Sequence, residues 1–593
     1  MKNLFFAFLL LGCAAAIFAA AIDSPYLYGI HWYGKTDSIS VGQRTDVEDM
    51  SGDKGIWDLE IAHVDSSAAP AWDLPSYFVG HSQKVTQGKG NSLIFRLHPY
   101  WSRNVPHASD PYTLTQYAND CKSAANTLKD YVHIWQIGNE VNINGENNRW
   151  GGSGYNVPWE PTPAQYADTY IACRDKIHEI TPNTTPAAQF VLMQPVSPGN
   201  AIGGTRYMDG NEFLWRQIDA VSDKGKIDGF GIHAYAPPSA ADYGVESFMD
   251  DIREQLMIID QFGLGDRPVF ITEWNKHMPN QAHAEIGAKF CHRIFTALNA
   301  WNTGSGGEWP GHPNHNIVAA TWFVYPKDFG WDEYALQYWK TQIASTDKDV
   351  NPWYSFNYAC GLGYASGAYG GGSTSIPNNA LWWEDTFNGA SLDQTAPLPD
   401  WKAETSGGGS VSMSGSGSVR LLGNGTTDGG GGIRTAGYVY GNFRMEANVT
   451  FTNAARSNTS GAQANMDIRI REGSKGYSFT FFTSQSLENA GRVILRRTNE
   501  WTQIGSFNTA VSGGINTGDT FQIEITANGS NIAFKAYKNG STAPSVDWNI
   551  TDSGQTVGWI RIMTWNLNEA RVNNFKLGGP QWGGSGIEDW AIY

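Results

Sequence analysis

The sequence predicts an α/β protein of two domains, a (β/α)₈ barrel followed by an all-β sandwich of the jelly-roll kind. Three observations predict it. Short apolar runs alternate with amphipathic segments from about residue 25 to 360; a Gly- and Ser-rich stretch follows; apolar residues then recur with period two to the end of the chain. At 593 residues the chain is long enough for both domains.

Composition and charge exclude several classes of protein. The chain is 13% aromatic and only 17% charged, which argues against a disordered protein or a coiled coil. Its formal net charge is −16, and such a surface repels nucleic acid and anionic lipid. We therefore expect a neutral partner, no nucleic acid and a monomeric protein.

The first residues resemble a secretory signal. Residues 1–21 hold one Lys, an apolar run and small residues before a polar start, which predicts cleavage after Ala21 and a secreted or periplasmic protein. An alternative interpretation is a lipoprotein anchored through Cys13. No later segment is apolar over the roughly 18 to 20 residues that a membrane span needs.

The first domain is predicted over residues 22–359. Helical patterns, such as 113–131 and 161–180, separate its strands, and Thr162 with Pro163 suits a cap and first turn. Alternating units of this number favour a closed barrel over an open sheet. The eight strands are predicted to begin near Tyr26, Trp57, Leu93, Val132, Phe190, Ile227, Pro268 and Val318.

The cysteines point to neither zinc nor a disulfide framework. Four remain after the signal, without C-x-x-C spacing, and we expect buried free thiols. They are Cys121, Cys173, Cys291 and Cys360.

The second domain follows a change in composition. Residues 360–380 are predicted to be a flexible linker. Residues 381–579 then have the pattern of short strands with Gly and Asn turns, which predicts an antiparallel sandwich. The tail, residues 580–593, is too short to form a domain.

Two glutamates close apolar strands of the barrel. Glu140 follows the fourth predicted strand and Glu273 lies at the end of the seventh. Active sites of (β/α)₈ enzymes form at these carboxyl ends. A charge there is costly unless it is paired or hydrogen-bonded, so two of them favour a functional site over two structural glutamates.

The residues around this pair resemble those of clan A glycoside hydrolases, retaining barrel enzymes with glutamates at the ends of strands four and seven. The resemblance rests on the segment from Ile137 to Glu140, on Glu273, and on the supporting residues of strands six and eight, which are His233, Tyr235 and Trp322. It covers roughly residues 25 to 360. Here Val141 follows the acid, where several members have Pro.

The resemblance implies a role for each residue. Glu140 would be the acid/base and Glu273 the nucleophile, with the carboxyl groups about 5 to 5.5 Å apart. Asn139 would bind the sugar 2-hydroxyl and Tyr235 would orient Glu273. The remaining substrate-binding residues would be His233, with Trp322 stacking on the sugar that is cleaved, and Arg96 and His98 in support. No cofactor and no catalytic metal is implied.

The second domain resembles a concanavalin-A-like sandwich, and residues 440–451 resemble a strand of family 16 glucanases. That strand carries one acid, Glu446, instead of the family's paired acids, so we expect binding rather than catalysis. Glu384 or Asp385 together with Asn573 could hold a structural calcium ion.

These observations predict a secreted retaining β-glycoside hydrolase, endo-acting on a glucan, mannan, xylan or galactan. The alternatives are a non-catalytic carbohydrate-binding surface protein and a transglycosylase that uses the same site.

Overall fold

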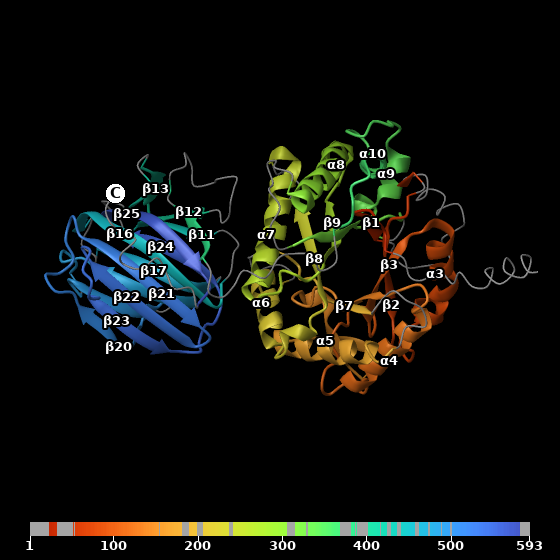
Figure 1. The fold of residues 1–593 in the computed structure, drawn as a ribbon, viewed down its shortest axis with the longest axis horizontal. Helices are drawn as coiled ribbons and strands as arrows, with labels where there is room; N and C mark the ends of the chain where they lie inside the picture. Colours follow the sequence, from red (N-terminus) through yellow and green to blue (C-terminus); the bar gives the residue numbers. More distant parts are fainter. Residues whose placement is uncertain are drawn as a thin grey trace, which may run out of the picture.

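The computed structural model has two domains side by side, a barrel of strands within a ring of helices and a β-sandwich (Figure 1). It describes residues 23–31, 51–52, 54–152, 154–180, 189–198, 206–236, 241–304, 315–327, 330–367, 381–385, 387, 401–414, 417–423, 429–435, 440–456, 462–471, 475–487, 489–498 and 501–580. The predicted signal lies outside these residues. No helix among them is long and apolar enough to cross a membrane.

The first domain is a closed parallel barrel, as the sequence predicts. Each predicted strand is present and in the predicted order. The strands are β1 (Tyr28–His31), β2 (Trp57–His63), β3 (Ser92–His98), β4 (Ile134–Ile137), β7 (Phe190–Met193), β8 (Gly229–Ala236), β9 (Val269–Lys276) and β10 (Ile317–Trp322).

Helices surround this barrel and cover its apolar outer face (Figure 1). Thr162 caps helix α5 as predicted, with Pro163 in the first turn, and it forms a capping box with Gln165. The helices are α3 (Pro75–Lys89), α4 (Leu114–Leu128), α5 (Pro163–Ile177), α6 (Gly210–Ala220), α7 (Val245–Gln261), α8 (Gln281–Thr303), α9 (Leu336–Gln342) and α10 (Pro352–Leu362). All four predicted free thiols are buried among them.

Short elements decorate the loops. A two-stranded hairpin, β5 (Asn148–Trp150) and β6 (Tyr155–Pro158), follows strand β4. Single turns of 3₁₀-helix are η1 (Ala71–Asp73), η2 (Asn144–Glu146), η3 (Lys224–Lys226), η4 (Ala241–Gly244) and η5 (Asp332–Tyr334).

The predicted linker begins too early. Helix α10 continues through Cys360 to Leu362, and the backbone of Gly367 donates a hydrogen bond to Ile317 of β10. Residues 360–367 therefore belong to the barrel, because their backbone groups are bonded to it. The rest of the predicted linker lies outside the described residues.

The second domain is a sandwich of two antiparallel sheets. One sheet has the order β13-β14-β25-β16-β21-β22-β23, with β11 also paired to β25, and the other has β12-β15-β24-β17-β18-β19-β20. The strands are β11 (Leu381–Asp385), β12 (Trp401–Ser406), β13 (Ser410–Met413), β14 (Val419–Leu422), β15 (Gly430–Thr435), β16 (Phe443–Arg456), β17 (Gln463–Arg471), β18 (Lys475–Phe482), β19 (Arg492–Arg497), β20 (Gln503–Ala510), β21 (Thr520–Asn528), β22 (Asn531–Lys538), β23 (Val546–Thr551), β24 (Trp559–Trp565) and β25 (Leu567–Gly578).

The sandwich rests directly on helices α6 and α7 of the barrel (Figure 1). Trp215 of α6 and the backbone of Gly441 both donate to Gln261 Oε1 at 3.2 Å, and Arg216 donates to Thr556 at 3.3 Å. A Cβ atom on Gly441 would lie 1.8 Å from the indole of Trp215. The two domains are therefore in close contact at this interface.

Candidate active site

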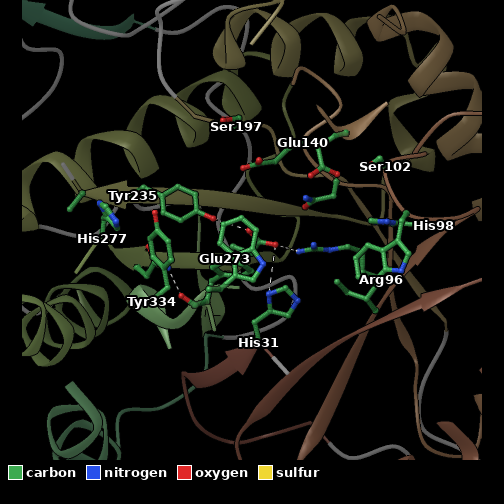
Figure 2. A pocket seen from close by; sticks show the side chains of 18 residues that line it. His31, Arg96, His98, Ser102, Glu140, Ser197, Tyr235, Glu273, His277 and Tyr334 are labelled. Carbon is green, nitrogen blue, oxygen red and sulfur yellow. Dashed lines mark hydrogen bonds and ion pairs between the residues drawn. The ribbon is translucent and has the colours of Figure 1, made fainter. Parts of the chain in front are cut away.

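The site is a cavity of about 530 Å³ at the carboxyl ends of the barrel strands. Polar side chains of its lining come from β1, β3, β8 and β9 and from the loops that follow β4 and β10, and apolar and aromatic side chains complete the wall. The lining residues include Glu140 and Glu273, and Figure 2 shows both beside the open space. The ends of these two strands therefore face one cavity.

The turn after β4 aims Glu140 into the cavity. Gly138 and Glu140 both have left-handed backbone, with φ of 77° and 38°, which glycine adopts freely and glutamate adopts at a cost of about 1 kcal/mol. Backbone hydrogen bonds hold the turn, from Asn139 to Asn104 Oδ1 at 2.8 Å and from Glu140 to the Pro195 carbonyl at 3.0 Å. These hydrogen bonds maintain a strained backbone conformation at Glu140, a residue that faces the site.

Glu273 lies in a network of donors. Arg96 donates to its Oε1 at 2.5 Å and Tyr235 Oη donates to its Oε2 at 2.8 Å (Figure 2). Nδ1 of His31 and Nδ1 of His233 each lie 3.8 Å from a carboxylate oxygen of Glu273. The expectation that Tyr235 orients Glu273 agrees with this geometry.

Electrostatics keep Glu273 ionised. Burial alone would raise the pKa of its carboxyl group, but the charge of Arg96 and the neighbouring imidazoles outweigh burial and hold that pKa well below its usual value. A carboxylate that remains charged in a cavity is available as a nucleophile.

His233 links the two glutamates. Its Nδ1 lies 2.7 Å from Glu140 Oε1. One carboxylate oxygen of Glu140 and one of Glu273 lie within 4.8 Å of each other.

The other predicted binding residues divide into two groups. Asn139, Arg96 and His98 line the cavity, and the Asn139 side-chain oxygen has no hydrogen-bond partner within the part of the chain that the structure describes. His233 is fully buried behind Glu140.

Trp322 does not fit its predicted role. It is 0% exposed and packs edge-on against Trp274, with ring centroids 4.8 Å apart. Successive side chains of a strand point to opposite faces, and Trp322 points outward to the helix layer, where it has no face to offer a sugar. The next residue, Phe323, points into the cavity instead.

Aromatic residues reach the cavity from loops. Trp101 and Trp331 line it, and Trp331 is 42% exposed. Figure 2 places Arg96, His98 and Ser102 on one side of Glu273 and His277 and Tyr334 on the other. The cavity therefore extends in both directions from the glutamate pair.

Several lining residues were missed from the sequence. His31 ends strand β1 and could have been found by the same rule that found Glu273. Glu146 lies in the 3₁₀ turn η2 and Ser197 in an irregular loop, where no strand pattern marks them. The other missed residues are Ile61, Ser102, Ala236, Asn275, His277, Phe323 and Tyr334.

Metal-ligating side chains form one group among the described residues, and it is Glu140, His233 and Glu273 themselves. Side chains of Glu384 and Asp385 lie outside what the structure describes, so a calcium ion in the sandwich stays a prediction.

Fold and site together define a (β/α)₈-barrel protein with two closely spaced carboxyl groups in an open cavity. No family model and no curated protein matches the chain. A family 39 glycoside hydrolase from Bacteroides cellulosilyticus WH2 is similar in structure, at 12% identity over 71% of this chain and 75% of that one, with a TM-score of 0.38.

Two other solved structures resemble parts of the chain. A Bacillus subtilis protein of unknown function with a galectin-like fold matches at 12% identity over 34% of this chain and 96% of that one, with a TM-score of 0.26. A xylan beta-1,4-xylosidase from Bacillus halodurans C-125 matches at 9% identity over 33% of this chain and 38% of that one, with a TM-score of 0.23. These likenesses concern the fold, and the argument for function rests on the site.

Proposed function

We propose that the protein is a secreted retaining β-glycoside hydrolase that acts within a β-linked polysaccharide. The observation that carries the proposal is the pair of carboxyl groups, whose oxygens approach within 4.8 Å in an open cavity. Retaining enzymes have carboxyl groups about 5 to 5.5 Å apart, whereas inverting enzymes need roughly 6.5 to 9.5 Å.

The environments of the two glutamates support different roles. Glu273, ionised and held by Arg96 and Tyr235, attacks the anomeric carbon and forms the covalent glycosyl-enzyme. Glu140, whose carboxyl group is hydrogen-bonded to His233, protonates the departing oxygen and then activates water. Asn139 offers its free side-chain oxygen to the sugar.

The shape of the site supports a polymer as substrate. The cavity extends on both sides of the glutamates, and aromatic side chains of Trp101 and Trp331 lie in its wall. A chain of sugars could therefore pass the catalytic pair in either direction. Glucans, mannans, xylans and galactans are the candidates.

Chemical rescue tests the roles. In Glu140→Ala, an activated aryl glycoside still departs without a proton, and azide should restore turnover and give a glycosyl azide with retained configuration. In Glu273→Ala, azide should give the inverted product. The anomeric form of the glycosyl azide from each variant is measured by NMR. If the two products are swapped, the roles of Glu140 and Glu273 are reversed.

Two further outcomes separate the alternatives. Products heavier than the substrate, seen by mass spectrometry, would identify a transglycosylase. A folded wild type that binds polysaccharides and cleaves none of a panel would identify a non-catalytic binding protein.

A further inference from the structure

A third carboxyl group, that of Glu146, lines the same cavity. It ends the 3₁₀ turn η2, in the connection that carries Glu140. Asn104 Nδ2 donates to the Glu146 carbonyl at 2.7 Å, while Asn104 Oδ1 accepts from the Asn139 backbone at 2.8 Å. One side chain thus fixes Glu146 relative to the catalytic turn, so its place in the wall is defined.

The Glu146 carboxyl group has no counter-ion of its own. This carboxyl group forms no ion pair with any residue that the structure describes. Burial, and then the negative charges of Glu140 and Glu273, raise its pKa to about 7, and Arg96 only partly opposes them. A half-buried acid that is left without a cation is costly for stability, which favours a functional reason for it.

Charges in the cavity wall do not balance. Arg96 is already paired with Glu273. Burial lowers the pKa of His31 to about 3 and that of His98 well below its usual value, so both are uncharged at neutral pH. His277 at the rim is bound to Glu333. The wall therefore presents more negative than positive charge to a ligand.

We propose that Glu146 contacts the sugar next to Glu140 and makes the site selective for uncharged sugars over sugars that carry a carboxylate or sulfate. A carboxyl group hydrogen-bonds sugar hydroxyls whether it is protonated or ionised. An anionic group placed beside it meets like charge in a partly dehydrated cavity, which costs affinity. The inference deepens the proposed function and rests on it.

The test compares one neutral polysaccharide with its carboxymethyl derivative, after a panel of glucan, mannan, xylan and galactan has shown which backbone is cleaved. In wild type, kcat/KM should favour the neutral form. In Glu146→Gln this preference should fall about 10-fold or more, because the amide removes the charge and keeps the hydrogen bonds. The readout is the ratio of the two kcat/KM values, so a loss of activity that both polysaccharide forms share does not affect it.

Glu160→Gln is the matched control. Glu160 is an exposed carboxyl group in the same connection, outside the cavity wall, so the substitution changes the net charge equally. The preference of Glu160→Gln for the neutral polysaccharide should equal that of wild type. An unchanged preference in Glu146→Gln, or an equal change in both variants, would overturn the inference.

Folding and function are separated by two further measurements. Thermal unfolding should give Glu146→Gln a midpoint at least equal to that of wild type above pH 7, since an uncompensated charge is removed. If wild type cleaves no polysaccharide, the proposed function fails; electrophoresis in gels that contain each polymer form then decides the inference. The inference about Glu146 holds only if the neutral polymer retards the wild-type protein more than the carboxymethyl polymer does, and if Glu146→Gln reduces that difference.

Discussion

Each domain of this protein brings two glutamates together, with different consequences. In the barrel, Glu140 and Glu273 face an open cavity from two strands of a parallel sheet. In the sandwich, Glu446 of β16 lies opposite Glu524 of β21 in the antiparallel register. Arg444 donates to both, at 3.0 Å to Glu446 and 3.3 Å to Glu524.

The difference lies in what each pair still offers to a ligand. Arg444 bridges the sandwich pair and Glu446 is only 1% exposed, so that pair is already satisfied by the protein. In the barrel, Arg96 bonds to Glu273 and does not bridge the pair. The carboxyl group of Glu140 faces open space in the cavity. Close carboxyl groups therefore do not make an active site unless space and unused bonding capacity remain beside them.

The largest expected effect tests which pair is catalytic. Glu273→Gln keeps the shape of the side chain but cannot form the glycosyl-enzyme, so kcat/KM should fall roughly 10⁴-fold or more. Glu446→Gln should leave activity within about twofold. The measurement is release of reducing ends from the preferred polysaccharide; a comparable loss in a folded Glu446→Gln protein would place catalysis in the sandwich.

The next effect concerns the arginines. Since Arg96 lowers the pKa of Glu273, the acid-side loss of activity in wild type should come only well below neutral pH. Without Arg96 that pKa rises, so in Arg96→Ala the loss on the acid side should begin at higher pH, and kcat/KM should drop about 10²-fold. The pH profile of kcat/KM checks this, and Arg444→Ala should reproduce the wild-type profile.

The contact between the domains gives a smaller effect, on stability. Gly441→Ala forces a methyl group against the Trp215 indole and should lower the free energy of unfolding by about 1–3 kcal/mol. Gly80→Ala, on an open part of helix α3, should change it little or raise it. Denaturant unfolding measures both; no loss in Gly441→Ala would mean that the two domains are held loosely.

The smallest effect concerns exposed tryptophans. Trp331→Ala should raise KM for the polysaccharide about 10-fold, because a flat aromatic face in the cavity wall is lost. Trp501 is similarly exposed, at 41%, but lies in the sandwich. Trp501→Ala should leave KM for short soluble oligosaccharides unchanged, and an equal rise in both variants would remove Trp331 from the substrate site.

Local patterns in the sequence determined the order of the barrel strands, the burial of the four thiols and the carboxyl-terminal position of Glu140 and Glu273. These features follow from apolar runs, helix caps and a charge at the end of a buried strand, all of which are contained in neighbouring residues. The same local rule located Arg96, His98, His233 and Tyr235 around the glutamates, because parallel strands end at one edge.

Only the tertiary structure decided the rest. Trp322 and Phe323 are neighbours in sequence, yet one faces the helices and the other the cavity, and this depends on how β10 is rotated in the barrel. Glu524 became the partner of Glu446 only through strand register, and Glu146 entered the cavity through a loop held by Asn104. Such contacts join residues that are distant along the chain or lie in irregular segments, so no periodicity in the sequence records them.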